Sequence, residues 1–294
     1  EEEVGLLVDF ELLRKLDNGR YITNFFIYPK ECQNEINELS CQFAERNYKV
    51  IWDIAGKLLE KGKELGIFSG AFRDADAQAY LAFDIELKTV FEEFPLGIFV
   101  KFQRRDGGNW GLIGMEAGAV SRIPLKFFSN SLSEWVNEVK WNGYQSDYGN
   151  RPYKYDTPDR NHLYLMKAIA EGRDISNLSV TEEGCLRNLL NEGFCVKDED
   201  GRVQVAALSV SNGDFGKITE YLTALPEYIR LREEKHSYYD EIKKVIERYS
   251  TFLLKEDLDY YVGMSSPLRA VLASLWLDKG VYTGGNSQFA ALYY

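Results

Sequence analysis

The sequence predicts a helix-rich α+β protein built from winged-helix modules, long linker helices and a central domain that contains a β-hairpin. Three observations predict this class. A helix–turn–strand pattern occurs twice, two amphipathic patterns run for about 35 residues each, and a glycine turn lies between two apolar runs. We therefore divide the chain into five segments, residues 1–30, 31–66, 67–158, 159–225 and 226–294.

The composition indicates a folded protein, because 45% of the 294 residues are hydrophobic and 28% are charged. The apolar runs are too short to cross a bilayer. Lys and Arg number 35 and Asp and Glu number 46, which gives a net charge of −11. A chain this acidic repels phosphate backbones, so DNA contact requires a local basic patch.

The cysteine and histidine content favours a reducing cytoplasm. Four cysteines lie far apart without a C-x-x-C pair, and there are only two histidines. We therefore expect neither a disulfide framework nor a zinc site, and no cofactor. The sequence also lacks the usual nucleophile-elbow, phosphate-loop, dinucleotide and zinc-protease motifs, so we expect no enzymatic activity.

Residues 1–30 are typical of the end of a small domain whose front half we expect upstream of Glu1. Apolar residues at helical spacing predict a helix over residues 1–16. Asp17-Asn18-Gly19 then predicts a turn, and residues 20–28 a strand that ends at Pro29. A long amphipathic helix follows to residue 66.

The central segment predicts a hairpin around Asp106-Gly107-Gly108, then a short helix from Ser133 to Trp141 and a loop to Asp159. The next segment predicts helices over 159–171 and 180–192, with a short helical turn near 174–178. The second helix has a capping box at its start and Gly193 at its end.

The C-terminal part continues the same alternation. A hairpin turn at 198–201 leads into a strand over 202–210. Pro226 then begins a helix to about residue 261, followed by a helix over 267–279 and a strand after Gly280.

An internal repeat supports the winged-helix interpretation. Residues 17–22 match residues 199–204, and each copy follows a helix with paired leucines. Each copy also precedes a strand, a proline and a long helix. These are the last parts of a winged helix, so residues 160–222 fit a complete module and residues 1–30 a truncated one.

The stretch Leu13 to Ile27, read as Leu-Arg-Lys-Leu-Asp-Asn-Gly-Arg-Tyr-Ile-Thr-Asn-Phe-Phe-Ile, resembles a loosely defined group of large Firmicute proteins. That group includes winged-helix transcriptional regulators and proteins with a sigma-factor region 4 domain. The resemblance covers residues 1–65 and implies a DNA-binding head joined to a linker helix in a cytoplasmic regulator of transcription.

A DNA-binding winged helix places its third helix in the major groove and its wing cations on phosphates. The residues of this chain at such positions are Arg14, Lys15, Arg20, Arg187, Asn188, Asn191, Lys197 and Arg202. Residues 151–225, however, contain 9 basic and 12 acidic side chains. Contacts with protein instead of DNA therefore remain an open alternative for the second module.

Two further expectations concern partners and ligands. The long helices at 31–66 and 227–261 could pair within the chain or form the axis of a homodimer. Aromatic side chains of the central domain could line a ligand pocket or simply pack in a core; the candidates are Trp110, Trp135, Trp141 and Tyr144.

Together these patterns predict a cytoplasmic transcriptional regulator that binds DNA mainly through its N-terminal head. The rest of the chain would serve dimerisation or sensing. A protein-interaction module that does not touch DNA and a small-molecule sensor are the alternatives.

Overall fold

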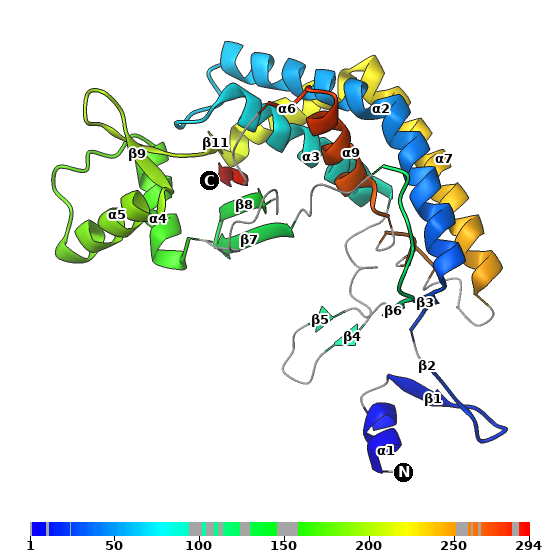
Figure 1. Cartoon of the computed structure of the whole chain (residues 1–294). Helices are drawn as coiled ribbons and strands as arrows, with labels where there is room; N and C mark the ends of the chain where they lie inside the picture. Colours follow the sequence, from blue (N-terminus) through cyan, green and yellow to red (C-terminus); the bar gives the residue numbers. More distant parts are fainter. Residues whose placement is uncertain are drawn as a thin grey trace. The chain divides into compact units, whose positions relative to one another are not determined.

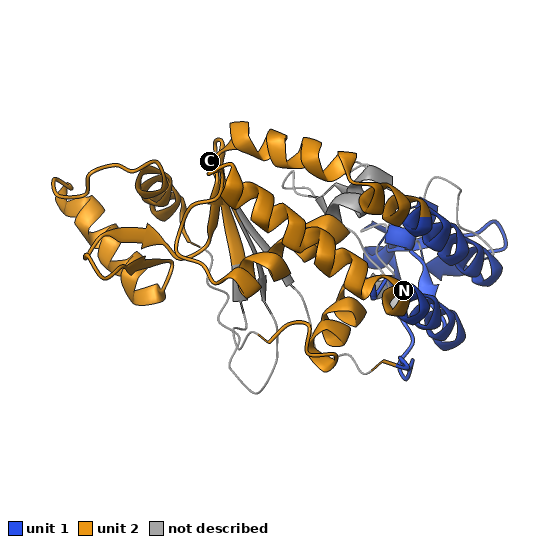
Figure 2. Cartoon of the chain, turned by 90° about the horizontal axis from the view of Figure 1, so that it is seen from above, with its two compact units in different colours: residues 1–43, 89–122, 234–268 blue, residues 44–88, 123–233, 269–294 orange. Residues whose placement is uncertain are grey.

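A computed structural model describes residues 2–9, 12–23, 25–93, 102–103, 109–110, 114–123, 130–145, 158–250, 258–259, 261–263, 266–283 and 288–294. The chain forms two compact units (Figure 2). Unit 1 comprises residues 1–43, 89–122 and 234–268, and unit 2 comprises residues 44–88, 123–233 and 269–294. The protein is helix-rich with small sheets, which confirms the α+β class.

The helices seen in Figure 1 are α1 (Glu2–Asp9), α2 (Lys30–Glu64), α3 (Asp74–Glu93), α4 (Arg160–Ala170), α5 (Val180–Glu192), α6 (Asn212–Ala224), α7 (Pro226–Tyr249) and α9 (Leu268–Asp278). The predicted helices at 31–66, 159–171, 180–192 and 267–279 are confirmed. The helix predicted over residues 1–16 is wrong beyond Asp9, because residues 13–15 form a strand. The helix predicted to reach residue 261 ends at Tyr249, since apolar spacing alone does not mark where a helix stops.

Helices α2 and α7 pair antiparallel (Figure 1). In unit 1, the hydroxyls of Ser40 and Tyr238 lie 2.8 Å apart and Phe43 packs on the Tyr238 ring. In unit 2, Lys57 Nζ lies 2.8 Å from Glu227 Oε1. Their apolar stripes are buried within the chain, as shown by Ile36, Phe43, Ile51, Ile54, Leu58, Leu231, Tyr238, Ile242 and Ile246. These two helices therefore pair within the chain, and a homodimer remains a prediction.

Unit 1 has a small aromatic core around three rings. Strand β3 (Ile27–Tyr28) pairs in parallel with β6 (Gly114–Met115). Tyr28 Oη donates to the carbonyl of Tyr261 at 2.6 Å, and the Phe26 N–H donates to Tyr261 Oη at 3.0 Å. The three rings of Phe26, Tyr28 and Tyr261 contact one another edge to face.

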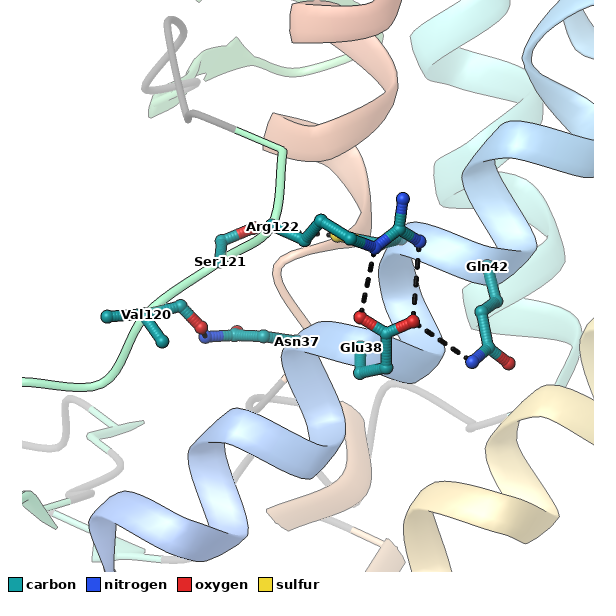
Figure 3. A network of polar contacts seen from close by, with 7 residues as sticks. Asn37, Glu38, Gln42, Val120, Ser121 and Arg122 are labelled. Carbon is teal, nitrogen blue, oxygen red and sulfur yellow. Dashed lines mark hydrogen bonds and ion pairs between the residues drawn. The ribbon is translucent and has the colours of Figure 1, made fainter.

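Residues 120–122, which follow β6, contact α2 through hydrogen bonds and an ion pair. Asn34 Oδ1 accepts from the Val120 N–H at 2.8 Å, while Asn37 Nδ2 donates to the Val120 carbonyl at 2.9 Å. Arg122 pairs with Glu38 through both Nε and a terminal nitrogen, and lowers the pKa of that carboxyl (Figure 3). Gln42 also donates to Glu38 (Figure 3).

Unit 2 contains a four-stranded sheet in the order β11 (Leu208–Val210), β12 (Gln288–Tyr293), β8 (Val139–Gln145) and β7 (Asn130–Val136). β11 and β12 are parallel, whereas the other neighbours are antiparallel. The short helix predicted from Ser133 to Trp141 is wrong, because these residues form a hairpin through Asn137, whose φ is 51°. Asparagine tolerates that conformation in a two-residue turn. The confirmed C-terminal strand β12 provides the partner that stabilises β8.

Three helices, α2, α3 and α9, pack in unit 2 around the buried side chain of Trp276. Its ring packs against Trp52 and Phe83, and its indole N–H donates to the Tyr48 carbonyl at 2.7 Å. Tyr282 donates to Asp76 at the start of α3. This arrangement brings α2, α3 and α9 together around one buried tryptophan.

Other differences from the sequence prediction are local. The strand predicted over 202–210 divides into β10 (Val203–Val205) and β11, which belong to different sheets. The helical turn predicted near 174–178 is not helical, because Asp174 accepts from the Ser176 N–H in a local turn. The glycine-centred hairpin is confirmed where it is described, as β4 (Phe102–Gln103) against β5 (Asn109–Trp110). Its Asp106-Gly107-Gly108 turn lies outside the described residues.

Candidate functional site

The first candidate region, which we call the α4–α5 module, comprises residues 159–205 of unit 2. Asp159 caps α4 by accepting from the His162 N–H at 2.9 Å. α5 leads through Gly193, at φ 81°, into β9 (Cys195–Lys197), which pairs antiparallel with β10. Its core is formed by buried side chains of both helices and the hairpin: Leu163, Leu165, Met166, Ile169, Leu189, Phe194, Cys195 and Val205.

The start of α5 is fixed by a capping box and an ion pair. Ser179 Oγ accepts from the Glu182 N–H, and Glu182 accepts from the Ser179 N–H at 2.8 Å. Arg173 also donates to Glu182 at 2.7 Å. The Ser179 N–H, followed by Arg173, lowers the pKa of Glu182 from 4.5 to about 2.

This capping carboxylate makes the start of α5 sensitive to acid. The pKa of Glu182 is lower in the folded chain than in the unfolded one. The ionised carboxylate therefore stabilises the fold fully above pH 4.5, and this stabilisation is lost as the pH falls towards 2. We expect the protection factors of the backbone amides at residues 182–185, which compare the observed exchange rate with the intrinsic rate at the same pH, to fall over that range. The variant Glu182→Gln should show lower protection factors at neutral pH and a weaker dependence of these factors on pH. An unchanged pH profile in the variant would refute this assignment.

The exposed side of the module carries charges of both signs. Arg187, Asn188 and Asn191 are exposed on α5, and Lys197 and Arg202 are exposed on the β9–β10 hairpin. Neither Arg187 nor Lys197 forms an ion pair with another described residue. The same surfaces bear exposed or half-buried carboxylates, namely Glu183, Glu192, Asp198, Glu199 and Asp200. The hairpin turn is therefore more acidic than basic.

The second candidate region, which we call the N-terminal hairpin, comprises residues 13–23 of unit 1. β1 (Leu13–Lys15) pairs antiparallel with β2 (Tyr21–Thr23). The turn closes with Gly19 at φ 78°, and Asn18 Oδ1 accepts from the Arg20 N–H at 3.0 Å. A left-handed residue at this point suits glycine because it lacks a Cβ.

The N-terminal hairpin presents three cations. Arg14, Lys15 and Arg20 are all exposed, and Asp17 is the one carboxylate between residues 13 and 23. Lys15 Nζ lies 5.9 Å from the centre of the Tyr21 ring. Over the described residues, none of the three cations forms an ion pair. Among the described residues, no carboxylate therefore neutralises these three charges.

The predicted aromatic pocket is described at one of its four residues. Trp141 is 2% exposed and its ring meets Phe194 edge to face at 5.4 Å. Trp141 thus joins β8 to the core of the α4–α5 module, and its indole N–H has no hydrogen-bond partner among the described residues. The side chains of Trp110, Trp135 and Tyr144 lie outside the described residues, so the pocket remains a prediction.

A different pocket lies between α4 and α5. It has a volume of about 250 Å³ and is lined by Asn161, Tyr164, Leu165, Arg173, Thr181, Glu182 and Cys185. The sequence contains no signal for it, because its residues come from two helices and a loop with ordinary amphipathic spacing.

Neither a metal centre nor a membrane span occurs in the part of the chain that is described. No three of the described His, Cys, Asp and Glu side chains come together as a metal site. No described helix is both long and apolar enough to cross a bilayer. Comparison with known proteins gives no match to a family model, to a curated protein or to a solved structure.

Proposed function

We propose that this protein is a cytoplasmic regulator of transcription that contacts DNA through the N-terminal hairpin. The observation that supports the proposal most is a group of three exposed cations that form no ion pair with another described residue, Arg14, Lys15 and Arg20, on a two-stranded hairpin with a single carboxylate. The order of helix α1, hairpin and long helix α2 is also that of the last parts of a winged helix, in which the hairpin wing lies on phosphates.

The α4–α5 module is the better candidate for protein contact. Its helix α5 and its hairpin repeat the same order, but here the shorter helix α6 stands between the hairpin and the long helix α7. Its hairpin turn, however, places Asp198, Glu199 and Asp200 between Lys197 and Arg202. Three carboxylates beside two cations repel a phosphate backbone, which favours a protein surface as the partner.

The test is binding of the purified chain to random-sequence duplex DNA across a salt series. We expect the affinity to fall steeply with salt, since each phosphate contact releases counterions. The triple variant Arg14→Ala, Lys15→Ala, Arg20→Ala should bind more weakly and reduce the slope of log affinity against log salt by about 3.

The matched control is the triple variant Arg187→Ala, Lys197→Ala, Arg202→Ala, which removes the same charge from the α4–α5 module. It should leave the affinity and the salt slope close to those of the unmodified chain. Equal losses in both variants would contradict the assignment to the N-terminal hairpin. Absence of binding by the unmodified chain at low salt would refute DNA contact by this chain.

A further inference from the structure

We propose that the pocket between α4 and α5 binds a basic protein segment through one apolar anchor side chain. This inference does not depend on DNA binding by the N-terminal hairpin, which belongs to unit 1, whereas the pocket lies wholly within unit 2. The argument rests on the size of the pocket, the exposed apolar and aromatic residues of the two helices that line it, and the charge of residues 171–183.

The size of the pocket favours a side chain over a cofactor. Its volume of about 250 Å³ is below the range of roughly 300–1,000 Å³ that is usual for small-molecule sites. Leu165, 4% exposed, and Cys185 supply apolar walls, while Asn161 and Thr181 supply polar groups. Such a lining suits an aliphatic or aromatic side chain whose backbone stays near polar groups.

Exposed apolar residues extend the binding surface beyond the pocket. Val180, next to Thr181 in the chain, is 88% exposed. Tyr164 lines the pocket, is 48% exposed, and accepts a hydrogen bond from Asn137 Nδ2 at 2.6 Å, which orients its ring. A tyrosine that is already held in place loses little conformational entropy when a partner binds.

The charge beside the pocket selects a basic partner. Between residues 171 and 183 there are four carboxylates, Glu171, Asp174, Glu182 and Glu183, and one cation, Arg173. Arg173 pairs with Glu182 and Lys167 pairs with Glu171, which leaves Asp174 and Glu183 without an ion pair among the described residues, so this stretch keeps a negative charge. Lys or Arg residues that flank the anchor would therefore be attracted, and acidic segments would be repelled.

Cys185 provides a direct readout of occupancy. It is half-buried in the pocket, whereas Cys32, Cys41 and Cys195 are buried. Burial also raises the pKa of Cys32 and of Cys195 to about 12, so these thiols stay protonated. A thiol reagent should alkylate Cys185 first in the folded chain, because attack requires an accessible thiolate.

The experiment measures the rate of Cys185 alkylation by iodoacetamide in the full chain, with three peptide pools as probes. The first pool has a central Leu, Phe or Trp flanked by Lys and Arg; the second has the same anchors flanked by Asp and Glu; the third is basic with a central Ser. We expect only the first pool to protect Cys185, by about fivefold at about four times its Kd.

Charge variants separate binding at the pocket from general attraction. Glu183→Lys should abolish most of the protection, whereas Glu220→Lys, an equal charge change on the exposed side of α6, should retain it. The proposal is overturned if no pool protects Cys185, if the acidic or Ser pool protects it equally well, or if both variants respond alike. Equal protection by free indole would also overturn it, since the site would then be one for small molecules.

Discussion

Replacing Gly70 with alanine is expected to destabilise unit 2 by about 2–5 kcal/mol. Gly70 has φ 97°, a left-handed conformation that costs a residue with a Cβ about 1–2 kcal/mol. A Cβ at this position would also lie 2.1 Å from the Ala207 carbonyl oxygen and 3.0 Å from that of Val205. Both obstacles are backbone atoms, which cannot rotate away.

The close approach of Gly70 to Val205 and Ala207 joins two parts of unit 2 that are distant in the sequence. On either side of Gly70, Ser69 exchanges backbone hydrogen bonds with Ser209, and the Ala71 N–H donates to the Val205 carbonyl at 2.7 Å. The connection between α2 and α3 is thereby fixed against the end of the α4–α5 module. A Cβ at Gly70 would separate these partners.

Gly66→Ala is the matched control for this prediction. Gly66 also has a positive φ, of 65°, but a Cβ there meets no atom within 4 Å. The control should therefore cost only the conformational strain, about 1–2 kcal/mol. Denaturant unfolding of both variants separates the two causes. Equal destabilisation would show that close packing at Gly70 contributes nothing.

The helices with strong local signals could be predicted from the sequence. Asp159 before α4, the Ser179 and Glu182 capping box and Gly193 after α5 all act within one or two turns of chain. Local hydrogen bonds of this kind are encoded by neighbouring residues, so a sequence pattern is sufficient to place them. The sequence also predicts α2, for the related reason that one apolar stripe continues over its length.

The errors arose where distant residues decide the structure. Residues 133–141 form strands because β12, some 150 residues later, pairs with β8. The sequence does not predict α6, because Gly213 and Gly216 disfavour a helix, although Ser211 caps it by accepting from the Asp214 N–H. Tertiary pairing and packing outweighed local preference in both places.

The candidate sites divide in the same way. Exposure of Arg14, Lys15 and Arg20 followed from a turn that the sequence marks with Asn18 and Gly19. The pocket between α4 and α5 depends on the spacing of two helices that share a core with Trp141 of β8. That spacing is set by packing between non-neighbouring residues, so no local pattern could reveal it.

Replacing Tyr261 with alanine is expected to destabilise unit 1 by about 3–5 kcal/mol. Its ring is fully buried between Phe26 and Tyr28, and removing it leaves a cavity in a small core. The Phe26 N–H also loses the hydroxyl that accepts from it. Hydrogen exchange resolved by residue should show faster exchange in unit 1, with the largest increase at residues 26–28.

The variant Tyr261→Phe divides this loss into two parts. It keeps the ring and its edge contacts but leaves the buried Phe26 N–H without an acceptor, for which we expect about 1–3 kcal/mol. Tyr249→Phe is the control, because its hydroxyl donates to Glu35 at a more accessible position, and its effect should be much smaller. If Tyr261→Phe were as harmless as Tyr249→Phe, the hydroxyl of Tyr261 would have no part in fixing β3. Packing of the ring alone would then hold the strand that connects the N-terminal hairpin to α2.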